Sequence, residues 1–281
     1  LIAVARIVRN NANVLYEWND RTRVRIGWGR YAQMQSIDEL QVADGVAEFF
    51  PAQRSEHWIL SFERILADRT LLRLELYHKE YDSLRPRYEN LLDTAVLLPE
   101  LKPDRIRIAP SSARAEGIEV AIRHSEPGAL LWWASYAWTR VRDRLDAAQV
   151  PRSWDQEHAA SAGIAWSNRH WQLSLAATYH SGWPSSSVQL LTEEPLPIAA
   201  AQRNSERLRS YFDVDLRIAR DLAPRAGESM TVFFELSNVL NRRNDCCVEY
   251  EFEDEDDERF LELETLSGLP LLPSLGFTYR F

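Results

Sequence analysis

The sequence predicts an all-β protein, an antiparallel transmembrane β-barrel of which about eleven strands are present. Apolar and polar residues alternate in many segments of the 281-residue chain, which is typical of strands with one apolar and one polar face. The connections between these segments are alternately short and long. No run of about 18 apolar residues occurs, so no transmembrane helix is expected.

The end of the chain carries the clearest alternation. One face of the expected strand holds Leu275, Phe277, Tyr279 and Phe281. The other face holds Ser274, Gly276, Thr278 and Arg280. A terminal Phe is unusual in a soluble protein, whose ends are usually polar and frayed. This ending resembles the C-terminal strand of bacterial outer-membrane β-barrels, whose terminal Phe belongs to the signal read by the barrel-insertion machinery.

The first strands are expected in two groups. Residues 13–18 form a short apolar run that ends at the Asn19-Asp20 turn, and residues 22–28 then alternate apolar side chains with arginine and glycine. After a long polar segment, residues 58–63 alternate again. Residues 72–77 place three leucines opposite arginine, glutamate and tyrosine. Each group therefore predicts a hairpin.

The middle of the chain predicts two further hairpins. Residues 118–122 pair with residues 130–138 across Glu126-Pro127-Gly128, whose proline and glycine favour a turn. Residues 162–166 pair in the same way with residues 171–179.

The last strands follow the same pattern. Residues 212–218 and 232–236 alternate on either side of a turn near residues 224–227, and residues 273–281 close the chain.

Five long loops separate these hairpins, and we expect all of them on one side of the sheet. They cover residues 32–54, 83–112, 143–156, 183–207 and 243–270. Bacterial outer-membrane barrels have short turns on one side, long loops on the other and strands longer than those of soluble proteins. Single-chain barrels have even strand numbers, so about eleven strands predict half of a barrel of about 22. We therefore expect residues 1–281 to be the C-terminal part of a larger barrel.

Each strand has one face that would meet lipid and one that would line a wet lumen. The residues expected to face lipid are Trp132, Tyr136, Leu173, Leu175, Phe212, Leu216, Phe234 and Phe277. The residues expected to face the lumen are Arg73, Glu75, Glu119, Arg123, Asp215 and Glu235. The alternative is a soluble β-sandwich or barrel whose charged face meets water. Long loops, strand length and the terminal Phe together favour the membrane barrel.

The composition excludes some functions. A net charge of −9 argues against a nucleic-acid-binding protein, which needs a basic face. The ten Trp and ten Tyr suit membrane interfaces, where one edge of the ring is dry and the other is wet. The six histidines form no pair with metal-ligand spacing, so neither a metal site nor a cofactor is expected. No catalytic constellation is present either.

The last long loop holds both cysteines and an acidic run. Cys246 and Cys247 are adjacent. Neighbouring Cα atoms are about 3.8 Å apart, below the usual disulfide range of about 4.4–6.8 Å, so a bridge between them would be strained. Such a bridge would stiffen the base of the loop, and the alternatives are free thiols or a site for a soft metal. Residues 249–258 are expected to be solvated, with a cation-attracting or calcium-binding loop as the alternative.

Several short motifs resemble the C-terminal half of the barrel of TonB-dependent outer-membrane receptors. They are Thr22 to Gln33 with Ile37 to Leu40, Pro51 to Ser55, Ala115 to Val120, Asp155 to His158, and Glu235 to Arg243. Each motif is weak alone, but their order and spacing cover nearly the whole chain. The family's plug domain and energy-coupling box would lie N-terminal to this segment.

The resemblance implies an active transporter in the bacterial outer membrane that imports a scarce nutrient, such as a ferric siderophore or a cobalamin-like complex. It implies contacts with lipid, with the barrel-insertion machinery and, through the N-terminal part, with the TonB energy-coupling protein. The alternatives are a passive or adhesive outer-membrane barrel and, less favoured, a barrel enzyme.

A small-molecule or metal-chelate ligand is expected at the long loops. Aromatic rings offer stacking area, and arginine binds carboxylate or phosphate through two hydrogen bonds. The candidate ligand-binding residues are Arg85, Arg87, Tyr88, Trp154, Trp183 and Tyr250.

Overall fold

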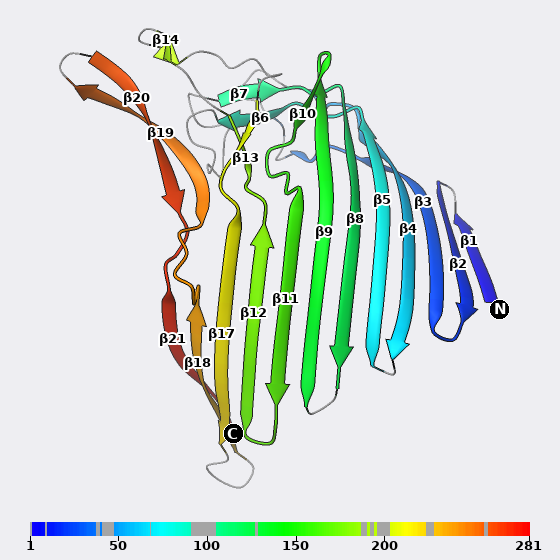
Figure 1. Cartoon of the computed structure of the whole chain (residues 1–281). Helices are drawn as coiled ribbons and strands as arrows, with labels where there is room; N and C mark the ends of the chain where they lie inside the picture. The colour runs from blue at the N-terminus through cyan, green and yellow to red at the C-terminus, as the bar shows by residue number, and fades with distance from the viewer. Residues whose placement is uncertain are drawn as a thin grey trace.

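One large antiparallel sheet forms most of the structure (Figure 1). The computed structural model describes residues 2–8, 10–37, 40, 48–67, 69–90, 105–126, 129–186, 190–191, 194–195, 203–222, 228–255 and 258–281. No helix in these ranges is long and apolar enough to cross a membrane.

Twelve strands follow one another in the large sheet in almost unbroken chain order. They are β1 (Ile2–Val8), β2 (Asn11–Asn19), β3 (Thr22–Gln33), β4 (Gln53–Ala67), β5 (Thr70–Asp82), β8 (Ser112–Ser125), β9 (Leu130–Leu145), β11 (His158–Ser167), β12 (Trp171–His180), β17 (Tyr211–Leu222), β18 (Ser229–Ser237) and β21 (Leu272–Arg280). A further strand, β10 (Ala148–Pro151), pairs with β9. The expectation of about eleven strands is confirmed, and the additional one is β1. In the part of the chain that the structure describes, the sheet is open, with β1 and β21 at its edges.

Small hairpins lie in the long connections. They are β6 (Arg87–Asn90) with β7 (Arg105–Ile108), β13 (Pro184–Ser185) with β16 (Glu206–Arg207), β14 (Leu190–Leu191) with β15 (Glu194–Pro195), and β19 (Asp245–Glu255) with β20 (Glu258–Ser267). The expectation of a plain loop at residues 243–270 is therefore wrong for most of that segment. Apolar residues alternate with the acidic ones in β19, and this alternation is enough for a hairpin with ten paired positions.

The long and short connections lie at opposite ends of the sheet (Figure 1). The strand ends that flank the five long connections all lie at one end, which we call the loop end, as expected. The other end, the turn end, carries the short turns. This follows from antiparallel pairing, since every second connection returns to the same side. The short turn between β1 and β2 also lies at the loop end, where the sequence did not predict a turn.

The strand register separates two faces. Aligned positions lie side by side on one face, and one such row runs across eight strands: Val24, Phe62, Leu74, Val120, Tyr136, Ala160, Tyr179 and Phe212. We call the face with Tyr136 the apolar face, and the face with Glu119 the polar face. All eight residues expected to face lipid lie on the apolar face, and all six expected in the lumen lie on the polar face. That division is confirmed, whereas contact with lipid stays a prediction.

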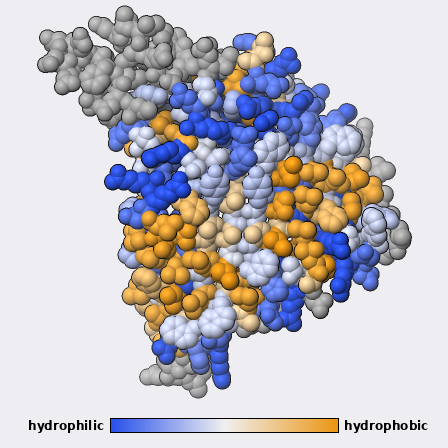
Figure 2. All heavy atoms as spheres, in the orientation of Figure 1, coloured by the Kyte–Doolittle hydropathy of each residue, from blue (hydrophilic) through white to orange (hydrophobic). Residues whose placement is uncertain are grey.

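Large apolar side chains stand exposed on the apolar face. Leu275 and Phe277 of β21 are 77% and 68% exposed. Figure 2 shows hydrophobic atoms gathered over the middle and turn-end part of the sheet, with hydrophilic atoms above them toward the loop end. Contiguous exposed apolar surface of this kind marks contact with lipid or protein.

The buried core lies beneath the long connections. Among the described residues, Ile108 of β7, Leu145 of β9 and Val150 of β10 form the buried apolar cluster. The buried Asp143 lies on the polar face of β9. Val150 is aligned with Asp143, and Leu145 lies two residues farther along β9, so both belong to the polar face as well. The long connections therefore fold over the polar face at the loop end, and they enclose the candidate site there.

Candidate functional site

Four connections converge around one cavity at the loop end. It has a volume of about 340 Å³, within the range typical of small-molecule sites. Its walls come from β6, from residues 152–154, from residues 183–186 and 203–208, and from the start of β19. Four of the six predicted ligand-binding residues line it, namely Arg87, Tyr88, Trp154 and Trp183, and so does Cys246. Residues from distant parts of the chain are thus brought together.

A buried carboxylate, Asp143, binds two of the arginines that line this cavity. The Asp143 side chain is only 2% exposed. Arg87 donates to its Oδ2 at 2.6 Å, and Arg152 donates to its Oδ1 through Nη2 at 2.6 Å and Nε at 3.1 Å. Such charge-assisted bonds are stronger than neutral ones, and a buried charge needs them. Asp143 therefore ties β6 and the segment after β10 to the sheet.

A second carboxylate, Glu89, belongs to the lining of the cavity itself. It forms an ion pair with Arg203, accepts a hydrogen bond from Arg87 at 2.8 Å and accepts another from the Ser153 hydroxyl at 2.7 Å. Burial, with the positive charge of Arg87 nearby, lowers the pKa of Arg203 to about 10, so this group is still charged at neutral pH. The side-chain amide of Asn204, which also lines the cavity, donates a hydrogen bond to the Pro151 carbonyl at 2.8 Å.

The charges of this network do not cancel. Three guanidinium groups, Arg87, Arg152 and Arg203, share two carboxylates, Glu89 and Asp143. Among the described residues of this network, one positive charge is left beside a partly enclosed cavity, where the field is less screened than in open water. The cavity therefore favours an anionic group.

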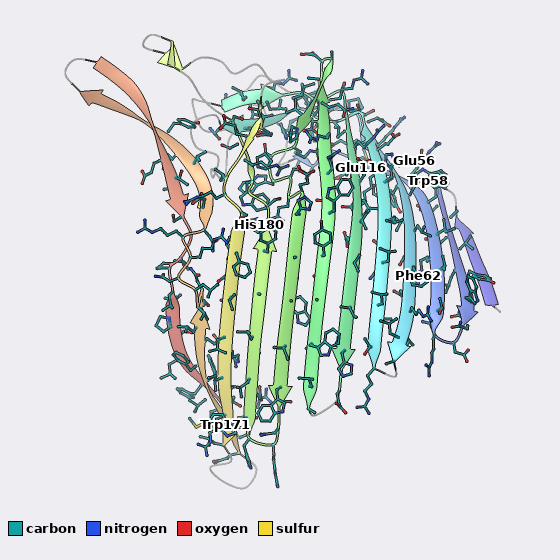
Figure 3. The ribbon with its side chains drawn as sticks, in the orientation of Figure 1. Glu56, Trp58, Phe62, Glu116, Trp171 and His180 are labelled. Atoms are coloured by element: carbon teal, nitrogen blue, oxygen red, sulfur yellow. A yellow bond between two sulfur atoms is a disulfide. The ribbon has the colours of Figure 1, made fainter. Side chains whose placement is uncertain are left out.

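Aromatic rings supply the other part of the lining. Trp154 and Trp183 meet edge to face, with ring centroids 5.1 Å apart. His180, labelled in Figure 3, lies 5.1 Å from Trp183 and stacks on Tyr211 at 4.7 Å. Since His180 and Tyr211 are aligned on the polar face, the rings form a continuous path from the cavity to the sheet.

The backbone holds Trp154 in an unusual conformation. Its φ is 69°, in the left-handed region that bulky residues seldom adopt, yet its side chain is 59% exposed. The neighbouring Asp155 fixes this turn, because its carboxylate accepts from the Val141 amide at 2.9 Å and from Arg207 at 2.7 Å. A strained residue that presents an exposed ring is a candidate for ligand contact.

The remaining predicted ligand residues lie outside the cavity lining. The Tyr250 hydroxyl donates to the carbonyl of Ser186, which does line the cavity, at 3.1 Å. The Arg85 guanidinium lies 2.6 and 2.7 Å from the side-chain oxygen of Gln53 at the start of β4. Arg85 is therefore not brought together with the other candidates. The role of all six residues in ligand binding stays a prediction.

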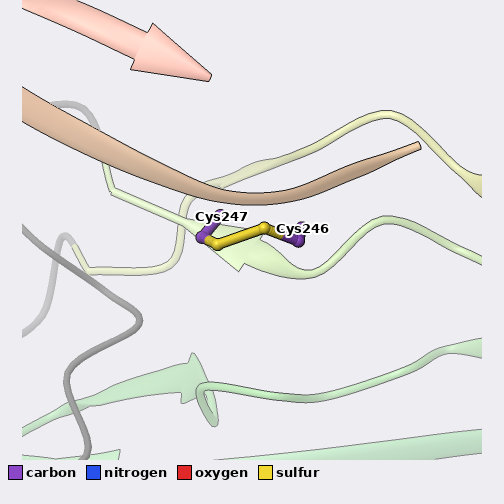
Figure 4. Close-up of a disulfide and its surroundings, with 2 residues drawn as sticks. All are labelled: Cys246 and Cys247. Carbon is purple, nitrogen blue, oxygen red and sulfur yellow. A yellow bond between two sulfur atoms is a disulfide. The ribbon is translucent and has the colours of Figure 1, made fainter. Parts of the chain in front are cut away.

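The two cysteines lie at the base of the β19–β20 hairpin. Figure 4 shows their sulfur atoms joined, and Cys246 faces the cavity while Cys247 is buried. Arg209 donates twice to Asp245, at 2.7 Å for each bond, and secures the same base. The oxidation state of the pair in the cell stays a prediction. The side chains of most residues in the acidic run 249–258 lie outside the described part of the chain. The described residues contain no group of three potential metal ligands.

The expected assembly signal lies on the edge strand β21. Leu275, Phe277 and Tyr279 belong to the apolar face, aligned with Phe234, Val232 and Met230, and Phe281 follows the strand end. Their part in membrane insertion stays a prediction.

Sequence reasoning missed the ionic half of the site. Asp143, Glu89, Arg152 and Arg203 were not among the candidates, although they define its charge. The sequence did carry one signal for Asp143, which is the only acidic residue in the arginine-rich segment Arg140 to Arg144.

Comparisons with known proteins agree with this architecture. The family model described as "TonB dependent receptor-like, beta-barrel" matches residues 10–239. No curated protein sequence matches the chain. Similar solved structures include BauA, the ferric preacinetobactin receptor from Acinetobacter baumannii, with TM-score 0.59, 14% identity and coverage of 96% of this chain and 36% of that one.

Two further structures are similar to the same extent. The ferric citrate transporter FecA has TM-score 0.59 and 14% identity, with coverage of 96% of this chain and 38% of that one. The ferric yersiniabactin uptake receptor FyuA from Yersinia pestis has TM-score 0.58 and 10% identity, with coverage of 96% and 37%. The chain thus spans little more than a third of the structures that it matches, and at these identities the likeness concerns the fold.

Proposed function

Because the chain belongs to the TonB-dependent receptor β-barrel family, we propose that it forms part of an active transporter that imports a scarce nutrient across the bacterial outer membrane. The apolar face supports this proposal, since its exposed large side chains suit a lipid environment. Proteins of this family are transporters rather than enzymes.

We place residues 1–281 in the C-terminal part of a larger barrel. Two observations support this: the sheet is open at β1 and β21 within the described residues, and similar structures are about two and a half times as long. The other strands of the barrel would pair with β1 and β21. This pairing would satisfy the backbone hydrogen-bonding groups of these two edge strands inside the bilayer. A plug domain and the contact with the TonB protein would belong to the preceding part. The barrel-insertion machinery would read the terminal strand.

The ligand that the cavity supports best is an anionic chelate with flat, ring-like surfaces, such as a ferric siderophore. The observation that carries this proposal is the convergence of three arginines and two tryptophans around one cavity, with one positive charge left uncompensated among the described residues. Arginine pairs with carboxylate or phenolate oxygens, and tryptophan stacks on rings. BauA, FecA and FyuA, which are similar in structure, are receptors or transporters of ferric complexes. A cobalamin-like complex is the other ligand class of this proposal.

Uptake by the full-length receptor tests this function. Cells that depend on the receptor are grown on a panel of iron chelates and on cobalamin, with the native protein or with Trp154→Ala. Trp18→Ala is the matched control, because Trp18 is a similarly exposed tryptophan far from the cavity. We expect Trp154→Ala to weaken uptake of one chelate about tenfold, a typical loss for one stacking contact.

Two outcomes would contradict the proposal. Uptake that persists without the TonB protein would indicate a passive barrel. Equal uptake by both variants and the native receptor, for every compound imported, would remove the cavity from the ligand path.

A further inference from the structure

The cysteine pair forms part of the wall of the candidate cavity, and its two members differ in access. Cys246 lines the cavity together with Val248 and is exposed. Cys247 is buried, with 9% of its surface exposed. The two sulfur atoms are bonded to each other (Figure 4). A reagent that enters the cavity therefore meets the sulfur of Cys246 before that of Cys247.

A β-bulge in β19 presents Cys246 to the cavity. Asp245 aligns with Ser267 and Cys247 aligns with Leu266, so Cys246 is the extra residue of this irregular pairing. The extra residue of a bulge is left out of the ladder, and the bulge re-aims the side chains around it. The preceding residue is held in place, because Arg209 donates to Asp245 through two bonds of 2.7 Å. The bond between the cysteines can thus open without unpairing β19 from β20.

Positive charge lines the same cavity as Cys246. Arg87, Arg152 and Arg203 all belong to the lining. Among the described residues of their network, one of these charges is left uncompensated. The field of this charge attracts an anionic thiol and stabilises the thiolate, which is the form that attacks a disulfide. The cavity volume of about 340 Å³ is in the range of small-molecule sites, so a small thiol can enter.

We propose that Cys246 is a thiol-exchange site, at which an anionic low-molecular-weight thiol forms a mixed disulfide and fills the cavity. The thiolate attacks Sγ of Cys246, and the bond between Cys246 and Cys247 breaks. The bonding electron pair leaves with Sγ of Cys247, which takes up the proton that the incoming thiol released. The incoming sulfur is oxidised to the disulfide level while Cys247 is reduced to a thiol, so no other oxidant or reductant takes part.

The exchange is reversible, and it makes access to the cavity depend on the thiols outside the cell. When the external thiol is scarce, the thiolate of Cys247 attacks Sγ of Cys246, expels the bound thiol and restores the bond. While the mixed disulfide is present, the bound thiol occupies the space beside Trp154 and Trp183 where the chelate would bind. This effect on uptake rests on the proposed function, whereas the exchange itself rests on the geometry of the pair.

Mass spectrometry of the purified full-length receptor tests the exchange. The native protein is treated with glutathione, an anionic thiol, acid stops the reaction by protonating the thiolates, and peptide mapping locates the adduct. Cysteamine, a cationic thiol, is compared at the same thiolate concentration. We expect an adduct on Cys246 that glutathione forms about tenfold faster than cysteamine, because of the charge beside the cavity. An adduct on Cys247, or none on either cysteine, would overturn the inference.

The source of the attraction is tested with Arg203→Gln, and Arg64→Gln is the matched control. Arg64 is an exposed arginine at the turn end of β4, far from the cavity. We expect Arg203→Gln to slow the reaction with glutathione toward the rate with cysteamine, and Arg64→Gln to keep the native rate. If Arg203→Gln fails to fold, the comparison of the two thiols on the native receptor decides. Equal rates for both thiols would contradict the attraction by the arginines.

Two single variants identify the sulfur that reacts. Cys247→Ser leaves the Cys246 thiol alone, and glutathione disulfide should convert it to a stable adduct, since no second thiol expels the glutathione. Cys246→Ser leaves only the buried Cys247, and we expect no adduct. The adduct of Cys247→Ser should bind the iron chelates of the uptake panel at least about tenfold more weakly than the same variant without glutathione, as measured by tryptophan fluorescence. Equal affinity with and without glutathione would contradict the blocking of the cavity.

Failure of this inference and failure of the proposed function give different results. A receptor that imports no iron chelate but carries the adduct on Cys246 supports the exchange site and contradicts the transport proposal. Normal chelate uptake by a receptor that forms no adduct contradicts the exchange site alone.

Discussion

Replacement of Asp143 by Asn tests whether buried charge holds the candidate site together. Asn has nearly the same shape but removes the negative charge on which Arg87 and Arg152 converge at 2.6 Å. Breaking a fully buried ion pair costs about 3–5 kcal/mol. The two arginine side chains are 31% and 33% exposed, so water compensates part of the loss. We therefore expect the loop end to lose about 2–3 kcal/mol of local stability.

Hydrogen exchange measures this loss, because it reports local opening separately from unfolding of the sheet. A loss of 2–3 kcal/mol should increase exchange of amides in β6 and in residues 152–157 by about 30- to 150-fold. Amides of β17 and β18 near the turn end should keep their native rates. Asp146→Asn is the matched control, since Asp146 is exposed and has a φ of 53°, which Asn tolerates. Unchanged exchange in Asp143→Asn would refute the anchoring role of this carboxylate.

Three further predictions concern other parts of the chain. Gly182→Ala should disrupt the cavity and abolish chelate uptake while the barrel still assembles, because an added Cβ would overlap the Leu208 carbonyl oxygen; native uptake would contradict this. Deletion of Phe281 should lower the amount of receptor recovered in outer-membrane fractions more than it lowers uptake per inserted molecule, and an unchanged yield would remove the assembly signal. Arg203→Gln should weaken binding of an anionic chelate about tenfold at neutral pH, because it removes one of the three guanidinium groups beside the cavity, and native affinity in a binding titration would contradict this.

The strands and their faces could be predicted because the relevant information is local. Alternation with period two is visible in a few residues, and it correctly assigned Tyr136 and Glu119 to opposite faces. β1 was missed because Ile2–Val8 is almost continuously apolar and shows little alternation. The β19–β20 hairpin was missed for the opposite reason. Val248, Tyr250 and Phe252 do alternate with glutamates, but the high charge of the segment favoured a solvated loop.

The candidate site could be predicted only in part. Residue type alone identified Trp154 and Trp183, since large aromatic residues in loops are frequent ligand contacts. The pairing of Arg87 with Asp143 joins residues 56 positions apart, and nothing in a single sequence indicates such a contact. Arg203 was missed for the same reason, because its burial against Glu89 depends on how two connections fold together.

Site-directed labelling in outer-membrane vesicles tests the central claim, that this sheet is part of the wall of a membrane barrel. Single cysteines are introduced at Tyr136 and Phe277 on the apolar face, and at Glu119 and Asp215 on the polar face, after Cys246 and Cys247 are replaced by Ser. We predict that a membrane-soluble reagent labels the first pair and a polar reagent labels the second. Equal labelling of all four positions by the polar reagent would contradict the claim.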